Sequence, residues 1–286
     1  MQLDTCAVCG STELRQWFST TFGAIGRCDG CGQILRADSP TVDSMVLAHR
    51  TGRLHESAYA TNSETATHDL SFVTRFVELA VANAPVRRVL DVGCSTGHCL
   101  ARFEALGFDC VGIEPVAELR EVARRRLDGV VIAAPIEEVE LEPGSFGAVV
   151  LWDSIEHLVD PRAVLEKVKS WLCPGGLLGI ATLNHDSLMY SIYHVLRRPL
   201  PAIAQGFGDR LYNPFHTYYF TMRSLARLVD DTGLSIEQHK GYEFPLSRLD
   251  ASKVFKAGMR GLYAIQWLTG TQGEQYMFAR KPPRAS

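Results

Sequence analysis

The sequence predicts an α/β fold, in which a seven-stranded, mostly parallel sheet carries helices on both faces and follows a small cysteine-rich unit. From residue 88 onward, short apolar and β-branched runs alternate with amphipathic helical stretches. The runs are continuously apolar, as in strands that are buried on both sides. In addition, four of the eight cysteines fall within the first 37 residues.

Size and charge restrict the kind of protein. The chain has 286 residues, enough for one large domain with a small appendage. A net charge of −3 argues against a surface that neutralises a nucleic-acid backbone. The first residues lack the basic and apolar segments of a secretion signal, and the longest apolar run, residues 175–183, is far shorter than the ~20 residues that span a bilayer. We therefore expect a cytoplasmic protein without a membrane partner.

The predicted elements follow one another in the order typical of a parallel sheet. An amphipathic helix is expected at residues 65–84, stopping before Pro85. Apolar runs predict strands at residues 88–92, 110–113, 130–132, 148–152, 177–182, 234–238 and 275–279. Helices are expected between them at residues 99–106, 116–127, 163–172, 222–231 and 254–268.

Composition divides the chain into three segments. Residues 1–37 are rich in Cys and Gly, and residues 38–64 form a polar stretch that we expect to be a connector or lid. Residues 65–286 carry the alternating elements. The alternation breaks at about residues 185–220, which are rich in aromatic residues, His and Pro, so we expect a substrate-binding insertion there.

The cysteines of the first segment form two Cys-x-x-Cys pairs, Cys6 with Cys9 and Cys28 with Cys31. Eighteen residues separate the pairs, and a glycine follows each pair where a tight turn is needed, as in zinc ribbons. Four thiolates complete the tetrahedral coordination of Zn²⁺ and leave no open position, so the predicted zinc site is structural. A segment of ~37 residues has little core of its own, so we expect its folding to depend on the metal.

Other interpretations of these cysteines remain open. They could be free thiols or disulfides, although paired motifs in a reducing compartment favour a metal. A zinc ribbon could also bind nucleic acid, but residues 1–40 hold four acidic residues and three arginines, which match a phosphate backbone poorly.

A loop with two glycines follows the first predicted strand, in the segment Leu90-Asp91-Val92-Gly93-Cys94-Ser95-Thr96-Gly97-His98. The glycines allow a ligand to approach the backbone closely. Asp91 can meet a cationic or hydroxyl group, and Glu114, at the end of the second strand, is placed to bind both hydroxyls of a ribose. A dinucleotide dehydrogenase would carry Gly-x-Gly-x-x-Gly instead, and a purely structural turn would leave both acidic residues unexplained. The loop therefore favours a cationic, phosphate-free cofactor.

Four motifs resemble those of the class I S-adenosylmethionine-dependent methyltransferases, and they occur in the same order. LDVGCSTG resembles the first motif, GIEP the second acidic position, SFGAVVLWDSIEHLVDP the fourth-strand motif, and LCPGGLLGIATLN the approach to the fifth strand. The resemblance covers about residues 65–281 and implies a Rossmann-like domain that binds S-adenosyl-L-methionine. Together with the zinc ribbon and the segment HTYYFT, it is similar to bacterial small-molecule and sugar methyltransferases.

The resemblance also implies roles for individual residues around the cofactor. The methionine part would lie along Gly93, Cys94, Ser95 and Gly97, with Asp91 at its amino group. The adenosine would contact Glu114 through its ribose, then Pro115, and then Ala134, Pro135 and Ile136 at the adenine. The sulfonium and the acceptor would be flanked by Trp152 and Asp153.

Methyl transfer is an in-line displacement, so the enzyme mainly aligns the acceptor and removes a proton from a hydroxyl. Histidine titrates closest to neutrality, and the candidate catalytic residues are His157, after the fourth strand, and His216, within the expected insertion. Candidate substrate contacts are Tyr59, Tyr218 and Tyr219. A structural interpretation remains open for each: His157 could anchor its loop, and the others could be packing residues.

Two enzymatic functions are compatible with these features. The first is methylation of a small-molecule acceptor, most simply a hydroxyl of a sugar or secondary metabolite. The alternative is an RNA methyltransferase that uses the zinc ribbon to bind substrate, which the acidic balance and the lack of a Lys/Arg run disfavour. A third, non-enzymatic function with a degenerate cofactor fold is disfavoured by the intact Asp91, Gly93, Gly97 and Glu114.

Overall fold

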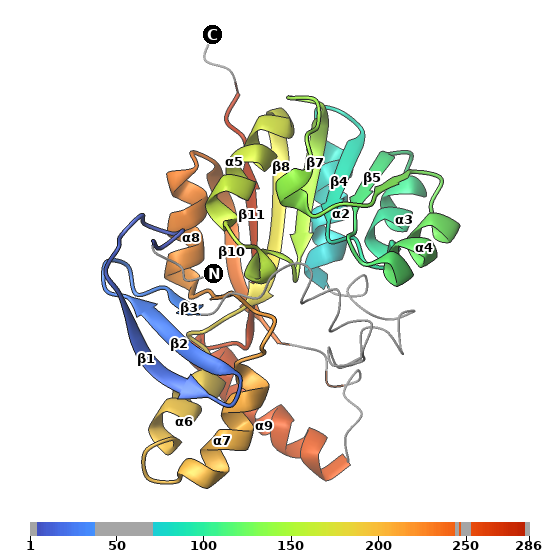
Figure 1. The fold of residues 1–286 in the computed structure, drawn as a ribbon. Helices are drawn as coiled ribbons and strands as arrows, with labels where there is room; N and C mark the ends of the chain where they lie inside the picture. The colour runs from blue at the N-terminus through green and yellow to red at the C-terminus, as the bar shows by residue number, and fades with distance from the viewer. Residues whose placement is uncertain (1–4, 38–70, 244–245, 247–252, 284–286) are drawn as a thin grey trace.

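Two sheets organise the protein in the computed structural model, which describes residues 5–37, 71–243, 246 and 253–283 (Figure 1). The larger sheet has seven strands in the order β10-β11-β8-β7-β4-β5-β6, and the smaller has four in the order β1-β2-β3-β9. Strands β4 to β8 are parallel, whereas β11 is antiparallel to both of its neighbours. The predicted Rossmann-like, seven-stranded, mostly parallel sheet is confirmed.

Buried apolar runs form the centre of the large sheet, because a strand that is covered on both faces needs no polar side. Every residue of the central strand β7 is buried. Strand β8 starts before the predicted position because Leu172 already pairs with Phe146 of β7 across an irregularity in the register. The strands are β4 (Arg88–Val92), β5 (Asp109–Ile113), β6 (Val130–Ile132), β7 (Phe146–Trp152), β8 (Leu172–Leu183), β10 (Ser235–Tyr242) and β11 (Glu274–Arg280).

Helices cover both faces of this sheet, each over its own apolar core. One core is formed with α2 (Ser71–Asn83), α3 (His98–Glu104) and α4 (Ala117–Arg126). The other is formed with α5 (Pro161–Trp171) and α8 (Met222–Asp231). Residues 65–70 of the first expected helix lie outside the described residues, and its described part ends before Pro85, as predicted.

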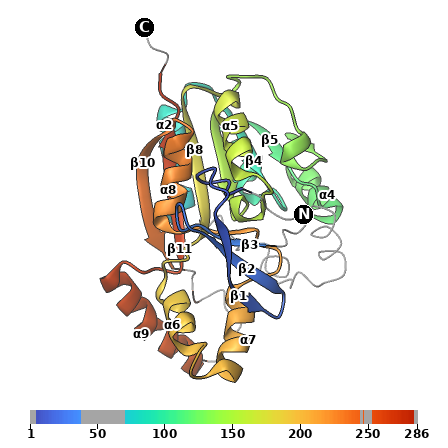
Figure 2. The same cartoon turned by 60° about the vertical axis from the view of Figure 1, so that its left-hand side comes forward.

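The expected insertion folds into helices and a strand. It contains α6 (Leu188–Leu196), α7 (Pro201–Leu211) and the short strand β9 (Tyr218–Tyr219). Four of its tyrosines pack with Ile25 and Ile34 of the N-terminal unit in a third core, namely Tyr190, Tyr193, Tyr212 and Tyr219. Helix α9 (Lys253–Thr269) lies below the large sheet in both views, at the same end of the molecule as α6 and α7 (Figures 1 and 2). None of the helices in the described parts of the chain has the length and apolar character needed to cross a membrane.

The N-terminal unit is built into the larger domain. Its strands are β1 (Leu14–Thr20), β2 (Gly23–Cys28) and β3 (Ile34–Arg36). Strand β9 of the insertion completes their antiparallel sheet by pairing with β3. This N-terminal unit, residues 5–37, is here called the ribbon. In both views it lies between α8 and the helices α6 and α7 (Figures 1 and 2). The connector or lid predicted at residues 38–64 lies outside the described residues.

A half-buried arginine adds a second attachment of the ribbon. Arg162 of α5 donates from Nε to the carbonyl oxygen of Ala7 at 3.0 Å and from Nη2 to that of Val8. It also pairs with Asp231 of α8 at 3.0 Å. The first turn of the ribbon is thereby bound to the helices that cover the large sheet.

Candidate active site

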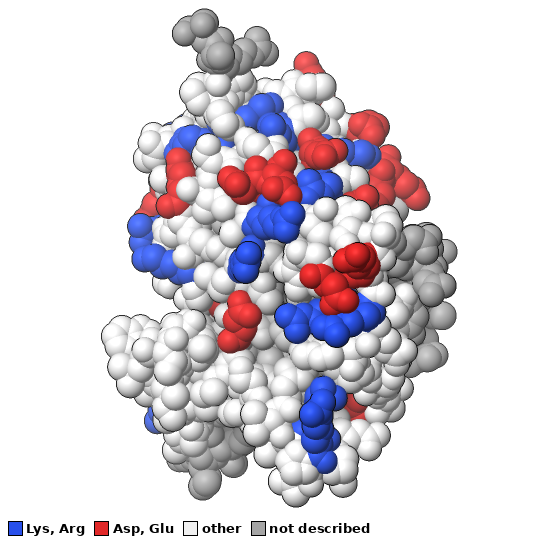
Figure 3. All heavy atoms as spheres, turned by 90° about the vertical axis from the view of Figure 1, so that its left-hand side faces the viewer, with Lys and Arg blue, Asp and Glu red and all other residues white. Residues whose placement is uncertain are grey.

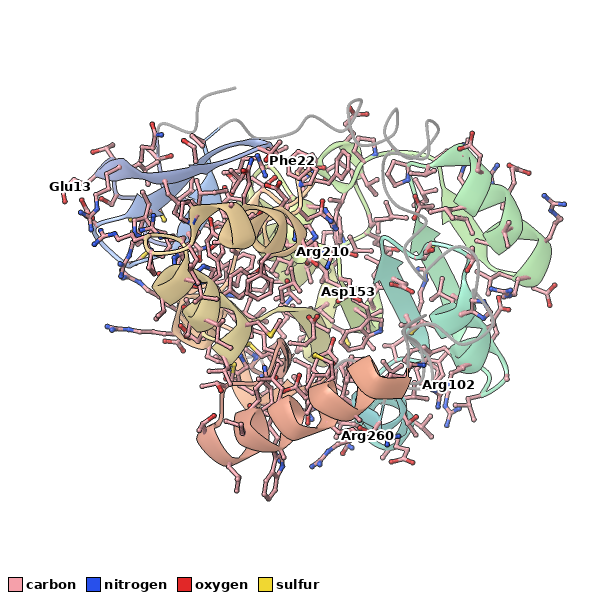
Figure 4. All side chains as sticks on the ribbon, turned by 90° about the horizontal axis from the view of Figure 1, so that it is seen from below. Glu13, Phe22, Arg102, Asp153, Arg210 and Arg260 are labelled. Carbon is pink, nitrogen blue, oxygen red and sulfur yellow. The ribbon has the colours of Figure 1, made fainter. Side chains whose placement is uncertain are left out.

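A cavity of about 270 Å³ opens at the carboxyl ends of β4, β5 and β7. In open α/β sheets this edge is where ligands bind. Figure 4 shows the molecule from this side, with Asp153 near the middle. The predicted site residues that line the cavity are Gly93, Glu114, Pro115, Pro135, Ile136, Asp153 and His157.

The glycine loop joins the ends of three strands. The N–H groups of Gly93 and Cys94 donate to the carbonyl oxygen of Ile113 at 2.9 and 3.1 Å. Gly93 has a φ of +74°, and a Cβ there would lie 2.5 Å from Oγ of Ser154, so only glycine fits. That Ser154 hydroxyl donates to the carbonyl oxygen of Val92 at 2.8 Å. Gly93 is the residue by which this loop reaches the cavity wall.

Among the described residues, the non-glycine residues with a left-handed backbone are Ser95, with a φ of +50°, and Asp153, with a φ of +51°. Both belong to the predicted cofactor set. Such a backbone costs about 1–3 kcal/mol and is found mostly at functional sites, where surrounding contacts hold it. The N–H of Asp153, for example, donates to the carbonyl oxygen of Ala181 at 2.9 Å.

Two buried carboxyl groups interact at this loop. Glu114 accepts hydrogen bonds from the N–H groups of Val116 at 2.8 Å and Ser95 at 3.0 Å. Burial raises the pKa of Glu114 to about 6 although these hydrogen bonds lower it. Burial, and then the charge of Glu114, raises the pKa of Asp91 to about 7. A ligand that brings positive charge and hydroxyl groups is therefore favoured here.

The other predicted cofactor residues surround the cavity without lining it: Asp91, Cys94, Ser95, Gly97, Ala134 and Trp152. The side chain of Trp152 lies in the core, which corrects its expected place beside the sulfonium. Successive side chains of a strand point to opposite faces. Asp153, the next residue, lines the cavity. Trp152 instead packs on Phe72 and Phe76 of α2, and its Nε1 donates to Sγ of Cys99 at 3.3 Å.

The two candidate catalytic histidines come together in space. The ring centroids of His157 and His216 are 4.8 Å apart. His157 lines the cavity, and its Nδ1 lies 2.9 Å from the carbonyl oxygen of Phe215. A carbonyl oxygen only accepts, so Nδ1 carries the proton and Nε2 is the basic nitrogen. Burial lowers the pKa of both histidines, so both rings are neutral at neutral pH.

The candidate substrate tyrosines of the insertion are packing residues in this structure. Tyr218 and Tyr219 are fully buried and do not line the cavity. Their hydroxyls donate to the carbonyl oxygens of Val159 at 3.1 Å and Asn213 at 2.8 Å. Both residues are buried because β9 pairs with the ribbon, so we leave them out of the acceptor site. Tyr59 lies outside the described residues.

Sequence reasoning missed part of the cavity wall, namely Val92, Ile113, Val116, Leu119, Glu137, Ser154, Leu158 and Phe215. The sequence does carry a signal for Val116 and Leu119. These two residues follow Glu114 and lie three positions apart, so they share one side of the next helix. Phe215 precedes a candidate histidine, but only the folded insertion brings it to the cavity.

The four N-terminal cysteines form one cluster. Sγ of Cys6 lies 3.6 Å from that of Cys31, Sγ of Cys9 lies 3.5 Å from that of Cys28, and all four sulfurs lie within 4.8 Å of one another. A disulfide needs about 2.05 Å. Four sulfurs at about 2.3 Å from a tetrahedral Zn²⁺ are about 3.8 Å apart. The cluster therefore fits zinc and not two disulfides.

Comparison with known proteins agrees with this geometry. Residues 65–239 match a family model described as a methyltransferase domain. A ubiquinone biosynthesis O-methyltransferase of Xanthomonas euvesicatoria is 31% identical over 182 residues, which cover 60% of this chain and 70% of the relative. The chain belongs to the class I S-adenosylmethionine-dependent methyltransferases.

Other methyltransferases share parts of the chain or its fold. An uncharacterised methyltransferase of Mycobacterium bovis is 36% identical over 104 residues, which cover 36% of this chain and 42% of the relative. The crystal structure of an S-adenosylmethionine-dependent methyltransferase from Mesorhizobium loti superposes with a TM-score of 0.54 at 14% identity. That match covers 75% of this chain and 100% of the Mesorhizobium chain, and shows that the two share a fold.

Replacing Glu114 with Ala is expected to weaken cofactor binding to this methyltransferase by about 1–3 kcal/mol, or roughly 5- to 150-fold in Kd. The reason is that the buried carboxylate predicted to bind the ribose hydroxyls is lost. Calorimetric titration with S-adenosylhomocysteine measures the change. The matched control is Glu118→Ala, which removes an exposed carboxylate from the same helix start. An unchanged Kd for Glu114→Ala would place the ribose elsewhere.

Cofactor binding is expected to weaken as the pH falls from about 8 to about 6. Asp91, with a pKa of about 7, and then Glu114, with a pKa of about 6, take up protons and lose the charge that attracts a cation. Asp91→Asn should flatten the upper part of this profile. Titrations at several pH values would show this, and an equally steep profile in the variant would assign the pH dependence to another group.

The same raised pKa affects the stability of the ligand-free protein. The folded state favours protonated Asp91, so deprotonation destabilises it progressively from the ordinary pKa of 3.8 up to about 7. Asp91→Asn should therefore raise the Tm of the ligand-free protein at about pH 8, but not at about pH 4. A lower Tm of the variant at about pH 8 would contradict this account.

Proposed function

We propose that this methyltransferase transfers the methyl group of S-adenosyl-L-methionine to a hydroxyl group of a small-molecule acceptor, such as a sugar or secondary metabolite. The observation that carries the proposal is the neutral imidazole of His157 on the cavity wall, with its tautomer fixed by Phe215. A hydroxyl becomes a strong nucleophile only as it loses its proton, and the free nitrogen of such an imidazole is a suitable base.

Each residue around the cavity has a separate role in this proposal. Glu114 binds the ribose, Asp91 faces the cationic end of the cofactor, and Pro115 and Ile136 contact the adenosine. When bound, the cofactor supplies an electrophilic methyl group. The acceptor oxygen would take this methyl group in place of the sulfur, and Nε2 of His157 would receive the hydroxyl proton. His157 then returns the proton to solvent.

We also propose that Cys6, Cys9, Cys28 and Cys31 hold a structural Zn²⁺. The sulfur–sulfur distances support this, and four thiolates leave no position for a substrate. Chain turns at each pair support it as well, since Gly10 and Gly32 have φ of +74° and +78° and close backbone hydrogen bonds to Cys6 and Cys28. The metal would keep the ribbon folded, and the reaction takes place elsewhere.

A small molecule is favoured over RNA as the acceptor. On the face in Figure 3, basic and acidic side chains are interspersed and form no uniformly positive surface. Within the ribbon, Arg15 is paired with Asp29 at 2.7 Å. Strand β3 pairs with β9, so this side of β3 is not available to bind RNA. The relative from Xanthomonas is named a ubiquinone biosynthesis O-methyltransferase, and that name also supports a small-molecule acceptor.

Turnover of labelled S-adenosyl-L-methionine against a panel of acceptors tests the proposal. The panel holds free sugars, nucleotide-sugars and phenols, each with an analogue in which an amine replaces the hydroxyl, and a structured RNA. Label is expected on hydroxyl compounds, with weak and salt-insensitive RNA binding. Methylation of the amine analogues alone, or tight RNA binding that falls steeply with salt, would contradict the proposal.

A further inference from the structure

We propose that Arg36 of the ribbon is a positioning residue for the acceptor side of the active site. It binds residues 212–217, here called the acceptor loop, and through this loop sets the place of Phe215, the hydrogen-bond partner of His157. The inference rests on the proposed function, because it assigns His157 to the acceptor. It gives the ribbon a part in catalysis although the cysteine cluster does not touch the cavity.

Arg36 ends strand β3 and is only 1% exposed, an unusual place for an arginine. Its guanidinium donates to the carbonyl oxygens of Tyr212 at 3.4 Å and Asn213 at 3.3 Å, and to that of Phe22 in the ribbon. Its backbone N–H donates to the carbonyl oxygen of Thr217 at 2.9 Å. One residue of the ribbon therefore binds both ends of the acceptor loop.

The same loop is bound to the active site on its other side. The carbonyl oxygen of Phe215 accepts from Nδ1 of His157 at 2.9 Å, and Phe215 also lines the cavity. The N–H of Thr217 donates to the carbonyl oxygen of Glu156 at 2.8 Å. The acceptor loop is thus held between Arg36 and the segment that carries the proposed base.

The interior of the loop is fixed by its own contacts, so a displacement at its ends would move it as a unit. Oδ1 of Asn213 accepts a hydrogen bond from the N–H of Phe215 at 2.9 Å. The carbonyl oxygen of Asn213 accepts one from the hydroxyl of Tyr219 at 2.8 Å. In contrast, Nδ1 of His216 is buried and has no hydrogen-bond partner among the described residues. The ring of His216 is therefore held by packing against His157, while its backbone N–H donates to the carbonyl oxygen of Asn213 at 3.2 Å.

Arginine is suited to this place in a way that lysine is not. The planar guanidinium directs several N–H groups in fixed directions and can reach carbonyl oxygens on both the ribbon and the loop. Lysine keeps the charge and a donor but not the fork. We therefore expect Arg36→Lys to keep part of the function and Arg36→Met, which keeps only an apolar stem, to keep less.

Kinetics of the full-length variants with a hydroxyl acceptor from the panel test the positioning role. For Arg36→Lys and Arg36→Met, kcat with the acceptor is expected to fall by about 10- to 100-fold, the size of effect that a displacement of about 1 Å produces. The Kd for S-adenosylhomocysteine should stay within about twofold, because Asp91 and Glu114 are untouched. The matched control is Arg162→Met, which loosens the ribbon at α5 without a contact to the acceptor loop.

A structural role without positioning would give a different result. In that case the variants at Arg36 and Arg162 would lower Tm and activity together, or Arg36→Lys would turn over the acceptor like the wild type. Either result overturns the proposal. If Arg36→Met does not fold, Arg36→Lys alone decides between these outcomes.

A spectroscopic measurement separates this inference from the proposed function. The ring ¹⁵N signals of His157 report whether Nδ1 carries the proton, and they require no acceptor. Loss of the Nδ1–H tautomer in Arg36→Lys, with the wild-type signals kept in Arg162→Met, supports the positioning role even if no hydroxyl compound is methylated. Unchanged His157 signals in Arg36→Lys overturn it.

Discussion

Replacing His157 with Asn is expected to lower kcat for methylation of a hydroxyl acceptor by about 10²–10⁴-fold, the contribution typical of a general base. Asn keeps an N–H donor for the carbonyl oxygen of Phe215 but has no basic nitrogen. The loop should therefore stay in place while the proton acceptor is lost. Single-turnover measurements with saturating cofactor would determine the chemical step, and the Kd for S-adenosylhomocysteine should remain close to that of the wild type.

The pH dependence of the wild type provides a second measurement of the same group. His157 must be neutral to act as a base, and burial lowers its pKa below 6.5, partly opposed by the Phe215 carbonyl and the charge of Asp153. The other titratable groups beside it are Glu156 and His216. We expect kcat to be flat at neutral pH and to fall only under more acidic conditions. A decrease of less than about tenfold in His157→Asn would mean that another group takes the proton.

Replacing Cys28 with Ser is expected to remove the metal and lower Tm by about 10 °C or more. In a protein of this size about 1 kcal/mol corresponds to about 2–4 °C, and a structural zinc site contributes several times that amount. The effect extends beyond the ribbon because Cys6, Val8 and Leu35 pack in the same core as Phe220 and Leu225 of the large domain. Loss of the ribbon would therefore expose that core.

Metal analysis and thermal unfolding measure this effect. The wild type should contain about one zinc per chain, and Cys28→Ser none. Cys173→Ser is the matched control, because Cys173 is also buried but lies in β8, outside the cysteine cluster. A metal-free wild type whose Tm does not respond to a strong chelator would refute the zinc site.

Much of the large sheet could be predicted because its central strands are runs of apolar residues in the sequence. The run at β7 is apolar and buried from end to end, and β4 is apolar except for Arg88 and Asp91. Burial on both faces is the simplest reason for such a run. The extension of β8 to Leu172 could not be predicted in the same way. Its Cys-Pro-Gly-Gly segment is typical of a turn, and Leu172 joins the strand because it pairs with Phe146 of β7 across an irregularity in the register.

The candidate site was predictable to the extent that it follows strand ends. Asp91, Glu114 and Asp153 lie on three strands whose carboxyl ends meet at one edge, so their convergence follows from a parallel sheet. The burial of Tyr218 and Tyr219 depends on pairing with Leu35 and Ile34, and no local pattern indicates a partner so distant in sequence. The sequence alone therefore does not predict the burial of these two tyrosines.

The pairing of β3 with β9 also determines how the chain can fold as it is synthesised. The N-terminal strands leave the ribosome first, but the strand that completes their sheet follows only after most of the large domain. Until then, β3 has an unpaired edge, which is where strands of other molecules can add and start aggregation. The small sheet is therefore complete only once β9 pairs with β3, and a chain interrupted before residue 218 would leave its N-terminal unit unfinished.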